Sequence, residues 1–178
     1  QWYSTISNNA TDTIRNCAVV DCYIESTSTT TDAGVVGGHV REHKLKLYNF
    51  LAYGNIVVNA TGNVGGHLGH GWGSTDEIYN SVFIGATPFS ALADKSRAKG
   101  NNFKNVYTDQ DLTVGEQKVQ AEIKDFKYTD DQIKKLDTAQ MLGAKAKTNM
   151  PNLDWVSMWS VNENSYPTPR ILSLKDYA

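Results

Sequence analysis

The sequence has little of what would place it in several large classes of protein. It contains two cysteines and four prolines in 178 residues, and its 17 basic side chains nearly balance 19 acidic ones. A near-neutral chain offers no basic surface for nucleic acid. No apolar run approaches the roughly 20 residues that a membrane helix needs. We therefore expect neither nucleic-acid binding nor membrane insertion.

Motifs of common enzymes are also missing. The sequence has no serine nucleophile elbow, no phosphate-binding loop and no dinucleotide fingerprint. It has no initiator Met and no signal-peptide pattern at Gln1, so we expect a mature chain or a piece of a longer protein. Cys17 and Cys22 would lie about 16 Å apart in an extended run, whereas a disulfide needs less than ~7 Å. We therefore expect two free thiols, one of them in the core.

What the chain does contain is a repeat. A Val-Gly-Gly-His block ends at His39 and occurs again at His67, 28 positions later. A second marker is an Asn that follows a large apolar residue by two positions, with spacings of 33, 31 and 25 between Asn16, Asn49, Asn80 and Asn105. Runs of β-branched residues follow the first two of these Asn residues. Repeats of this length cannot bury an apolar face alone, so successive copies must stack.

The marker residues suit a stack of β-strands. Asn tolerates left-handed backbone angles and can form amide ladders, and glycine permits tight bends. We predict a mainly β fold: a short parallel β-helix (β-solenoid) over residues 1–107, whose regular coils end near residues 86–90. A β-sandwich with coincidental Asn-Gly turns is the alternative.

The rest of the chain, residues 108–178, is predicted to form a C-terminal cap within the same domain. Alternating residues at 118–126 predict a strand. Thr129 with Gln132, and Asp137 with Gln140, are capping-box pairs that predict two short helices, the second ending at Gly143. The side chains expected to pack in the cap are Ile133, Leu136, Met141, Trp155, Trp159 and Tyr166.

The pattern Val-Gly-Gly-x-(Val/Leu)-Gly-x-Gly, followed by Ile-x-Asn-(Cys/Ser), resembles the GLUG repeats of bacterial secreted and surface proteins. These include adhesins, IgA-protease-like peptidases and multidomain proteins of gut bacteria. The stretch from Leu136 to Pro169 is similar to the segment that closes many such arrays, whereas Phe50 and Val106 depart from the usual small residue after Asn. The resemblance implies an extracellular or cell-surface location and further domains in a parent chain. It implies no single activity.

The histidines are the residues that could indicate a metal site. The segment from His39 to His43 matches the His-x-x-Glu-His motif of a zinc-peptidase family, which requires a helix. In a strand, residues four apart lie about 13 Å from each other, too far to share one ion. His39 and His67 hold the same place in the two blocks, so we expect them to stack in a solvated ladder. We expect no metal and no cofactor.

The strongest candidate for a ligand site is a glycine-rich stretch with aromatic and polar side chains. An aromatic ring among hydrogen-bonding groups suits a sugar, which has an apolar face and a rim of hydroxyls. The alternative is that Trp72 packs on the next coil. The predicted ligand-binding residues are His67, His70, Trp72, Asp76 and Tyr79.

These observations together predict a non-catalytic extracellular module that binds a glycan or a host-surface protein. One alternative is a spacer or scaffold for a catalytic domain elsewhere in the parent protein. Another is a β-helix enzyme that cleaves polysaccharides with two carboxylates about 5–9 Å apart. The acidic residues available for such a pair are Asp21, Asp32, Glu42, Asp76 and Glu77.

Overall fold

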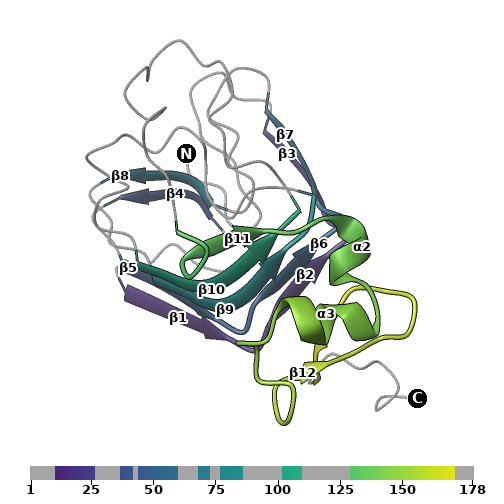
Figure 1. Ribbon diagram of the computed structural model, residues 1–178. Helices are drawn as coiled ribbons and strands as arrows, with labels where there is room; N and C mark the ends of the chain where they lie inside the picture. Colours follow the sequence, from purple (N-terminus) through teal and green to yellow (C-terminus); the bar gives the residue numbers. More distant parts are fainter. Residues whose placement is uncertain are drawn as a thin grey trace.

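A computed structural model describes the protein at residues 11–26, 37–41, 44–59, 68–72, 77–85, 102–109 and 129–170. The fold is mainly β, with a curled parallel sheet and a few short helices (Figure 1). Four strands pair in parallel with the next four along the chain. The first four are β1 (Thr11–Arg15), β2 (Ala18–Val20), β3 (Tyr23–Ser26) and β4 (Gly37–Arg41). Their partners are β5 (Lys44–Tyr48), β6 (Leu51–Tyr53), β7 (Ile56–Asn59) and β8 (Leu68–Trp72).

Three further strands extend the largest sheet. Strand β9 (Glu77–Phe83) is long enough to pair with both β5 and β6, and β10 (Asn102–Thr108) pairs with β9. Strand β11 (Ile133–Lys135) pairs with β10, which gives the order β1-β5-β9-β10-β11. The prediction that the regular stack ends near residues 86–90 is therefore wrong for this sheet, because β10 and β11 continue it.

The predicted Asn residues mark one corner of the sheet. Asn16, Asn49, Asn80 and Asn105 all have a positive φ, between 51° and 55°. The register places each beside the next, and Asn49 Nδ2 donates to Asn16 Oδ1 at 2.9 Å, as Asn105 Nδ2 does to Asn80 Oδ1. Asn adopts this backbone region more readily than other non-glycine residues. The predicted in-register Asn column is confirmed.

A second corner was not predicted. Asp21, Gly54 and Gly85 have φ values of 52°, 67° and 85° and follow one another at the same spacings as the Asn residues. The backbone N–H of Asp21 donates to the carbonyl of Tyr53 at 2.9 Å. A Cβ atom on Gly54 would collide with the Asp21 carboxylate. The second corner can therefore hold the Asp21 side chain only because position 54 carries no side chain.

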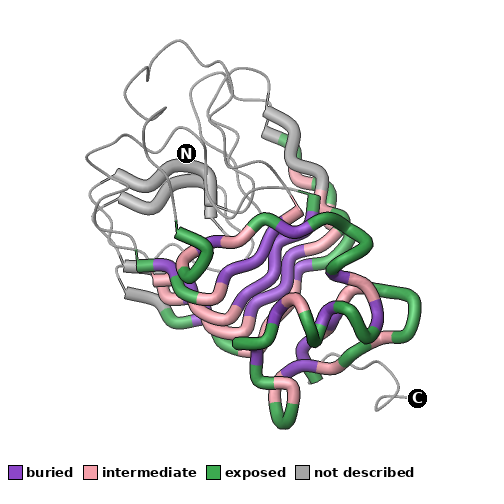
Figure 2. The backbone as a smooth tube through the Cα atoms, viewed as in Figure 1, coloured by how far each residue is buried: buried purple, intermediate pink, exposed green. Residues whose placement is uncertain are grey.

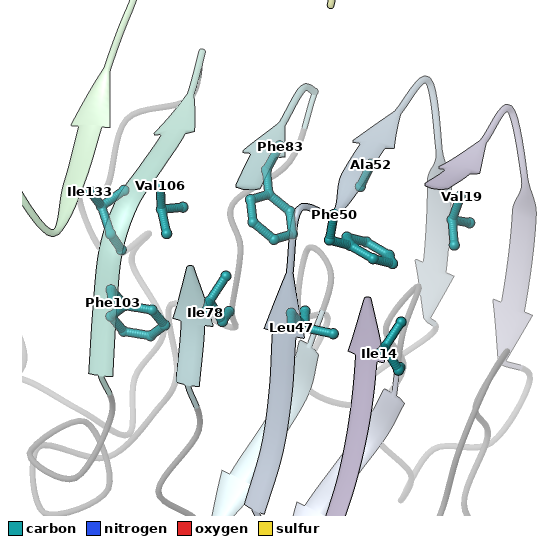
Figure 3. Close-up of a cluster of buried hydrophobic side chains, with 10 residues drawn as sticks. All are labelled: Ile14, Val19, Leu47, Phe50, Ala52, Ile78, Phe83, Phe103, Val106 and Ile133. Carbon is teal, nitrogen blue, oxygen red and sulfur yellow. The ribbon is translucent and has the colours of Figure 1, made fainter. Parts of the chain in front are cut away.

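The inner side of the curl holds an apolar core, drawn in Figure 3. Successive strand residues point to opposite faces. Before the Asn corner alternate residues are buried, whereas after it consecutive residues of β9 and β10 are buried, because both faces of the sheet are covered there (Figure 2). Cys17 and Cys22 are free and pack at the margin of this core. The buried residues are Ile14, Val19, Leu47, Phe50, Ala52, Ile78, Phe83, Phe103, Val106 and Ile133.

The C-terminal segment covers the opposite face of the sheet beyond the Asn corner. It contains α2 (Thr138–Met141), α3 (Ala144–Asn149) and the antiparallel pair β12 (Trp159–Ser160) and β13 (Thr168–Pro169). These elements share a second core with outward-facing residues of the sheet. Its buried members are Leu51, Val82, Ile84, Tyr107, Leu136, Met141, Ala146, Met150, Leu153 and Trp159.

Two predictions for the C-terminal segment have different outcomes. The capping box of Asp137 and Gln140 is present at α2, and Gly143 follows that helix with a φ of 56°. Thr129 and Gln132 do form the predicted hydrogen bond, at 3.1 Å. The residues after Gln132 nevertheless form β11 rather than a helix, because Ile133 enters the inner core through pairing with Val106. The strand predicted at 118–126 lies outside the described residues.

The predicted stacking of His39 on His67 is also wrong. His39 pairs with His70 and Gly37 with Leu68, an offset of 31 rather than the 28 that separates the similar blocks. The spacing of the corners, 31 to 33 residues, sets this register. A shift of three residues would turn every side chain to the other face of the strand.

Candidate functional site

The structure places the predicted ligand-binding residues unequally. His70 and Trp72 lie in β8, opposite His39 and Arg41 of β4, but their side chains are outside the description. His67 and Asp76 are outside the described residues altogether. Tyr79 is the predicted site residue whose surroundings can be followed.

Tyr79 belongs to a row of side chains on the outer face of the sheet. Ile78 is fully buried in the inner core, so its neighbour Tyr79 points outward. The register places Tyr79 between Tyr48 of β5 and Lys104 of β10, and Tyr48 beside Arg15 of β1. We call Arg15, Tyr48, Tyr79 and Lys104 the tyrosine row. Each member directly precedes one of the four corner Asn residues.

Two contacts along the tyrosine row involve the ring of Tyr48. The rings of Tyr48 and Tyr79 stack with centroids 5.3 Å apart and planes inclined by 21°. The guanidinium carbon of Arg15 lies 4.7 Å from the centroid of the Tyr48 ring, which is within range for a cation–π interaction. Both tyrosines are partly buried, whereas Arg15 and Lys104 at the two ends are exposed.

A second row, two residues earlier in each strand, adds a carboxylate. Lys46 pairs with Glu77 across β5 and β9, and Lys46 Nζ lies 3.5 Å from Glu77 Oε2. The Tyr48 hydroxyl donates to the same oxygen at 3.4 Å. The Lys46 side chain is 30% exposed and that of Glu77 is 13% exposed. Glu77 thus links the two rows.

The Asn corner separates this polar surface from the apolar surface that the C-terminal segment covers. Before the corner, the outward residues are polar, charged or aromatic, such as Thr13, Arg15 and Tyr48. After it, Leu51 and Val82 point outward and are buried under the C-terminal segment. The tyrosine row therefore lies on the part of the outer face that this second core does not use.

The described members of the two rows offer hydrogen-bonding groups and charge. Glycoside cleavage needs two carboxyl groups, and Glu77 is the one carboxylate among the described members of the two rows. Of the other acids considered, Asp21 lies at the second corner, and Asp32, Glu42 and Asp76 are outside the described residues.

Within the described segments, no group of three or more His, Cys, Asp or Glu side chains is placed to hold a metal ion. The first three residues of the His-x-x-Glu-His match, His39 to Arg41, lie in strand β4 rather than on a helix. In the same part of the chain, no helix is long and apolar enough to cross a membrane.

Two features of the C-terminal segment were also missed. A shallow pocket of about 420 Å³ lies between α2, α3 and the turn at Glu163. Asp154 begins a turn in which its carboxylate accepts hydrogen bonds from the backbone N–H groups of Val156 and Ser157 and from the Ser157 hydroxyl. These bonds to Ser157 hold the pKa of Asp154 below its ordinary value.

Sequence reasoning missed Arg15, Lys46 and Tyr48 although a signal for two of them was present. The Asn column fixes the register, so the residue before each Asn must belong to one row on the outer face. Arg-Asn, Tyr-Asn, Tyr-Asn and Lys-Asn at the four markers carry that information.

Comparison with protein-family models, with curated proteins and with solved structures finds no match to this chain.

Proposed function

We propose that the chain is a non-catalytic β-solenoid module of a larger bacterial secreted or cell-surface protein, and that it binds a glycan or a host-surface protein through its outer face. The solenoid interpretation is supported by the parallel pairing of β1–β4 with β5–β8 at offsets of 31 to 33 residues. The sequence resemblance to GLUG repeats supports the extracellular setting.

The tyrosine row is the observation that carries the binding proposal. Partly buried tyrosines flanked by exposed cations, outside the surface used by the C-terminal segment, are typical of recognition surfaces. Tyr48 and Tyr79 present ring edges and hydroxyls, and Lys46 and Glu77 add charged hydrogen-bonding groups. His70 lies in the middle of β8 and Trp72 at its end, separated by four residues from Glu77, where β9 begins, so both remain candidate contacts.

A glycan array followed by titration of each hit tests the proposal. Tyr79→Ala should weaken binding by about 5- to 150-fold, taking aromatic contacts at roughly 1–3 kcal/mol, while the far-ultraviolet circular dichroism spectrum stays unchanged. Tyr23→Ala is the matched control, because Tyr23 is 62% exposed and lies on β3. Tyr23→Ala should bind like the unaltered chain. An empty array, or full binding by Tyr79→Ala, would count against a receptor.

The second candidate is a spacer or scaffold, and one specific observation favours it. The Asn column and the tyrosine stack both run from strand to strand along the sheet. Such ladders stiffen a stack of repeats whether or not anything binds to it. An array without hits, together with a stable, extended module in solution scattering, would favour this function.

A further inference from the structure

We propose that the ligand of the tyrosine row is an acidic polysaccharide, and that Arg15, with Lys46 beside it, binds a carboxylate or sulfate group of that polymer. This inference rests on the proposed function and names its ligand class.

Both faces of Tyr48 are occupied within the protein. Tyr48 stands on β5, between Arg15 on β1 and Tyr79 on β9. The guanidinium covers one face at 4.7 Å and the Tyr79 ring covers the other at 5.3 Å. A neutral sugar that stacked on Tyr48 would have to displace one of these partners. Aromatic stacking on this ring is therefore not the way a ligand is recognised.

Arg15 is exposed although its guanidinium carbon lies over the Tyr48 ring, so the guanidinium remains accessible to a ligand. A guanidinium is planar, and its N–H donors point outward within that plane. When its face rests on a ring, these donors can still form two parallel hydrogen bonds with a carboxylate or sulfate. Arg15 is exposed and lies at the first described strand of the sheet. The stack thus orients the guanidinium before a ligand arrives.

The balance of charge favours an anion at this end. The described charged residues of the two rows are Arg15, Lys46, Glu77 and Lys104, three cations to one carboxylate. Glu77 Oε2 already faces Lys46 Nζ and accepts the Tyr48 hydroxyl hydrogen bond. At the other end of the tyrosine row, the backbone N–H of Asn105 donates to the carbonyl of Asp131, which brings an exposed acid close to Lys104. The cationic end is therefore that of Arg15 and Lys46.

The position of Lys46 matches this role. Thr13 is the register partner of Lys46, so Arg15 and Lys46 are diagonal neighbours on adjacent strands of one face. An oxyanion held by the Arg15 edge would sit within reach of the flexible Lys46 ammonium, which is 30% exposed.

Titration calorimetry on the whole chain with three polymers tests the inference: heparin as sulfated, polygalacturonate as carboxylated and dextran as neutral. We expect heparin or polygalacturonate to bind and dextran not to bind, with affinity falling as salt rises. Arg15→Gln should weaken binding by about 10- to 150-fold, the range for a charge-assisted hydrogen bond. Arg15→Lys should recover only part of this loss, because it keeps the charge without the planar donors.

Lys147→Gln is the matched control, since Lys147 is an exposed cation on α3. It removes the same charge from another surface and should bind like the unaltered chain. Equal losses in Arg15→Gln and Lys147→Gln would overturn the inference, because attraction would then be non-specific. Dextran binding that depends on Tyr79 but not on Arg15 would overturn the acidic ligand while leaving the proposed function standing. No binding to any polymer, with an empty glycan array, would overturn both.

Discussion

Replacement of Asn49 by Ala isolates the energetic role of the Asn column. Asn49 has a φ of 51° and donates from Nδ2 to Asn16 Oδ1 at 2.9 Å. Ala in the left-handed region costs roughly 1–2 kcal/mol, and loss of the amide hydrogen bond adds about 0.5–1.5 kcal/mol. Asn49→Ala should therefore lower the free energy of unfolding by about 1.5–3.5 kcal/mol, a large part of the roughly 5–15 kcal/mol typical of a domain.

Asn49→Gly separates the two contributions, because glycine adopts a positive φ without steric cost and loses only the amide. In urea unfolding, Asn49→Ala should shift the midpoint by about 1 M, and Asn49→Gly should shift it less. Asn102→Ala is the control, since Asn102 is exposed in β10 and absent from the positive-φ residues; its effect should stay within about 0.5 kcal/mol. If Asn49→Ala were as stable as the unaltered chain, or more stable than Asn49→Gly, the reasoning would be refuted.

Three further predictions use other parts of the fold. Gly54→Ala should strongly lower the melting temperature, because Gly54 has a φ of 67° and the new Cβ would meet the Asp21 carboxylate. Adding Asp21→Gly should restore part of the melting temperature, and no recovery in the double variant would contradict the clash. The pKa of Asp154 is lowered in the folded chain, so its contribution to stability is present above the unfolded pKa of about 3.9 and is lost as the pH falls below that value. Asp154→Asn should therefore destabilise the chain at neutral pH and hardly at all in strong acid, and an equal difference at both pH values would refute the assignment. Trp159→Ala should lower the free energy of unfolding by about 3–5 kcal/mol, because Trp159 is fully buried. Trp159→Phe should lower it less, because the Nε1 of Trp159 has no hydrogen-bond partner among the described residues. Val156→Ala is the control, since Val156 is 88% exposed.

The sequence could predict those parts of the fold in which the same residue type meets the same backbone requirement in every repeat. Asn is favoured at a left-handed corner, so its recurrence with an apolar residue two positions before it located the first column from sequence. The second corner is made by Asp21 in one repeat and by Gly54 and Gly85 in the next two. Asp and Gly satisfy the same backbone requirement with different letters, so the three positions share no common residue and the column became visible only in the structure.

The register of β4 and β8 could not be predicted for a related reason. The similar residues around His39 and His67 suggested that these two histidines pair. The corners on either side instead fix the number of residues in each repeat, and His39 therefore pairs with His70. The helix predicted after Thr129 failed in a similar way. The Gln132 side chain accepts the expected hydrogen bond from the backbone N–H of Thr129, but the residues that follow pair with β10 and form a strand. Tertiary pairing overrides local helix signals in such cases.

The candidate site was predicted only through Tyr79. Trp72 drew attention because glycines surround it, whereas the tyrosine row depends on residues 31 to 33 positions apart that meet only when the strands stack. Arg15 and Tyr48 are marked in the sequence only by their place directly before Asn16 and Asn49, which becomes informative once the Asn column fixes the register. Their contact is a consequence of the Asn column.

The central claim is that successive repeats stack in parallel and in register, and one distance tests it directly. Thr13, Lys46, Glu77 and Asn102 are register partners on four neighbouring strands, and both end members are exposed. Spin labels on Thr13→Cys and Asn102→Cys, in a chain with Cys17 and Cys22 replaced by Ser, can be measured by double electron–electron resonance. Three steps of ~4.8 Å place the two Cα atoms about 14 Å apart, so a short, narrow distribution is expected. A distribution centred at twice that separation or more would contradict the stacked arrangement.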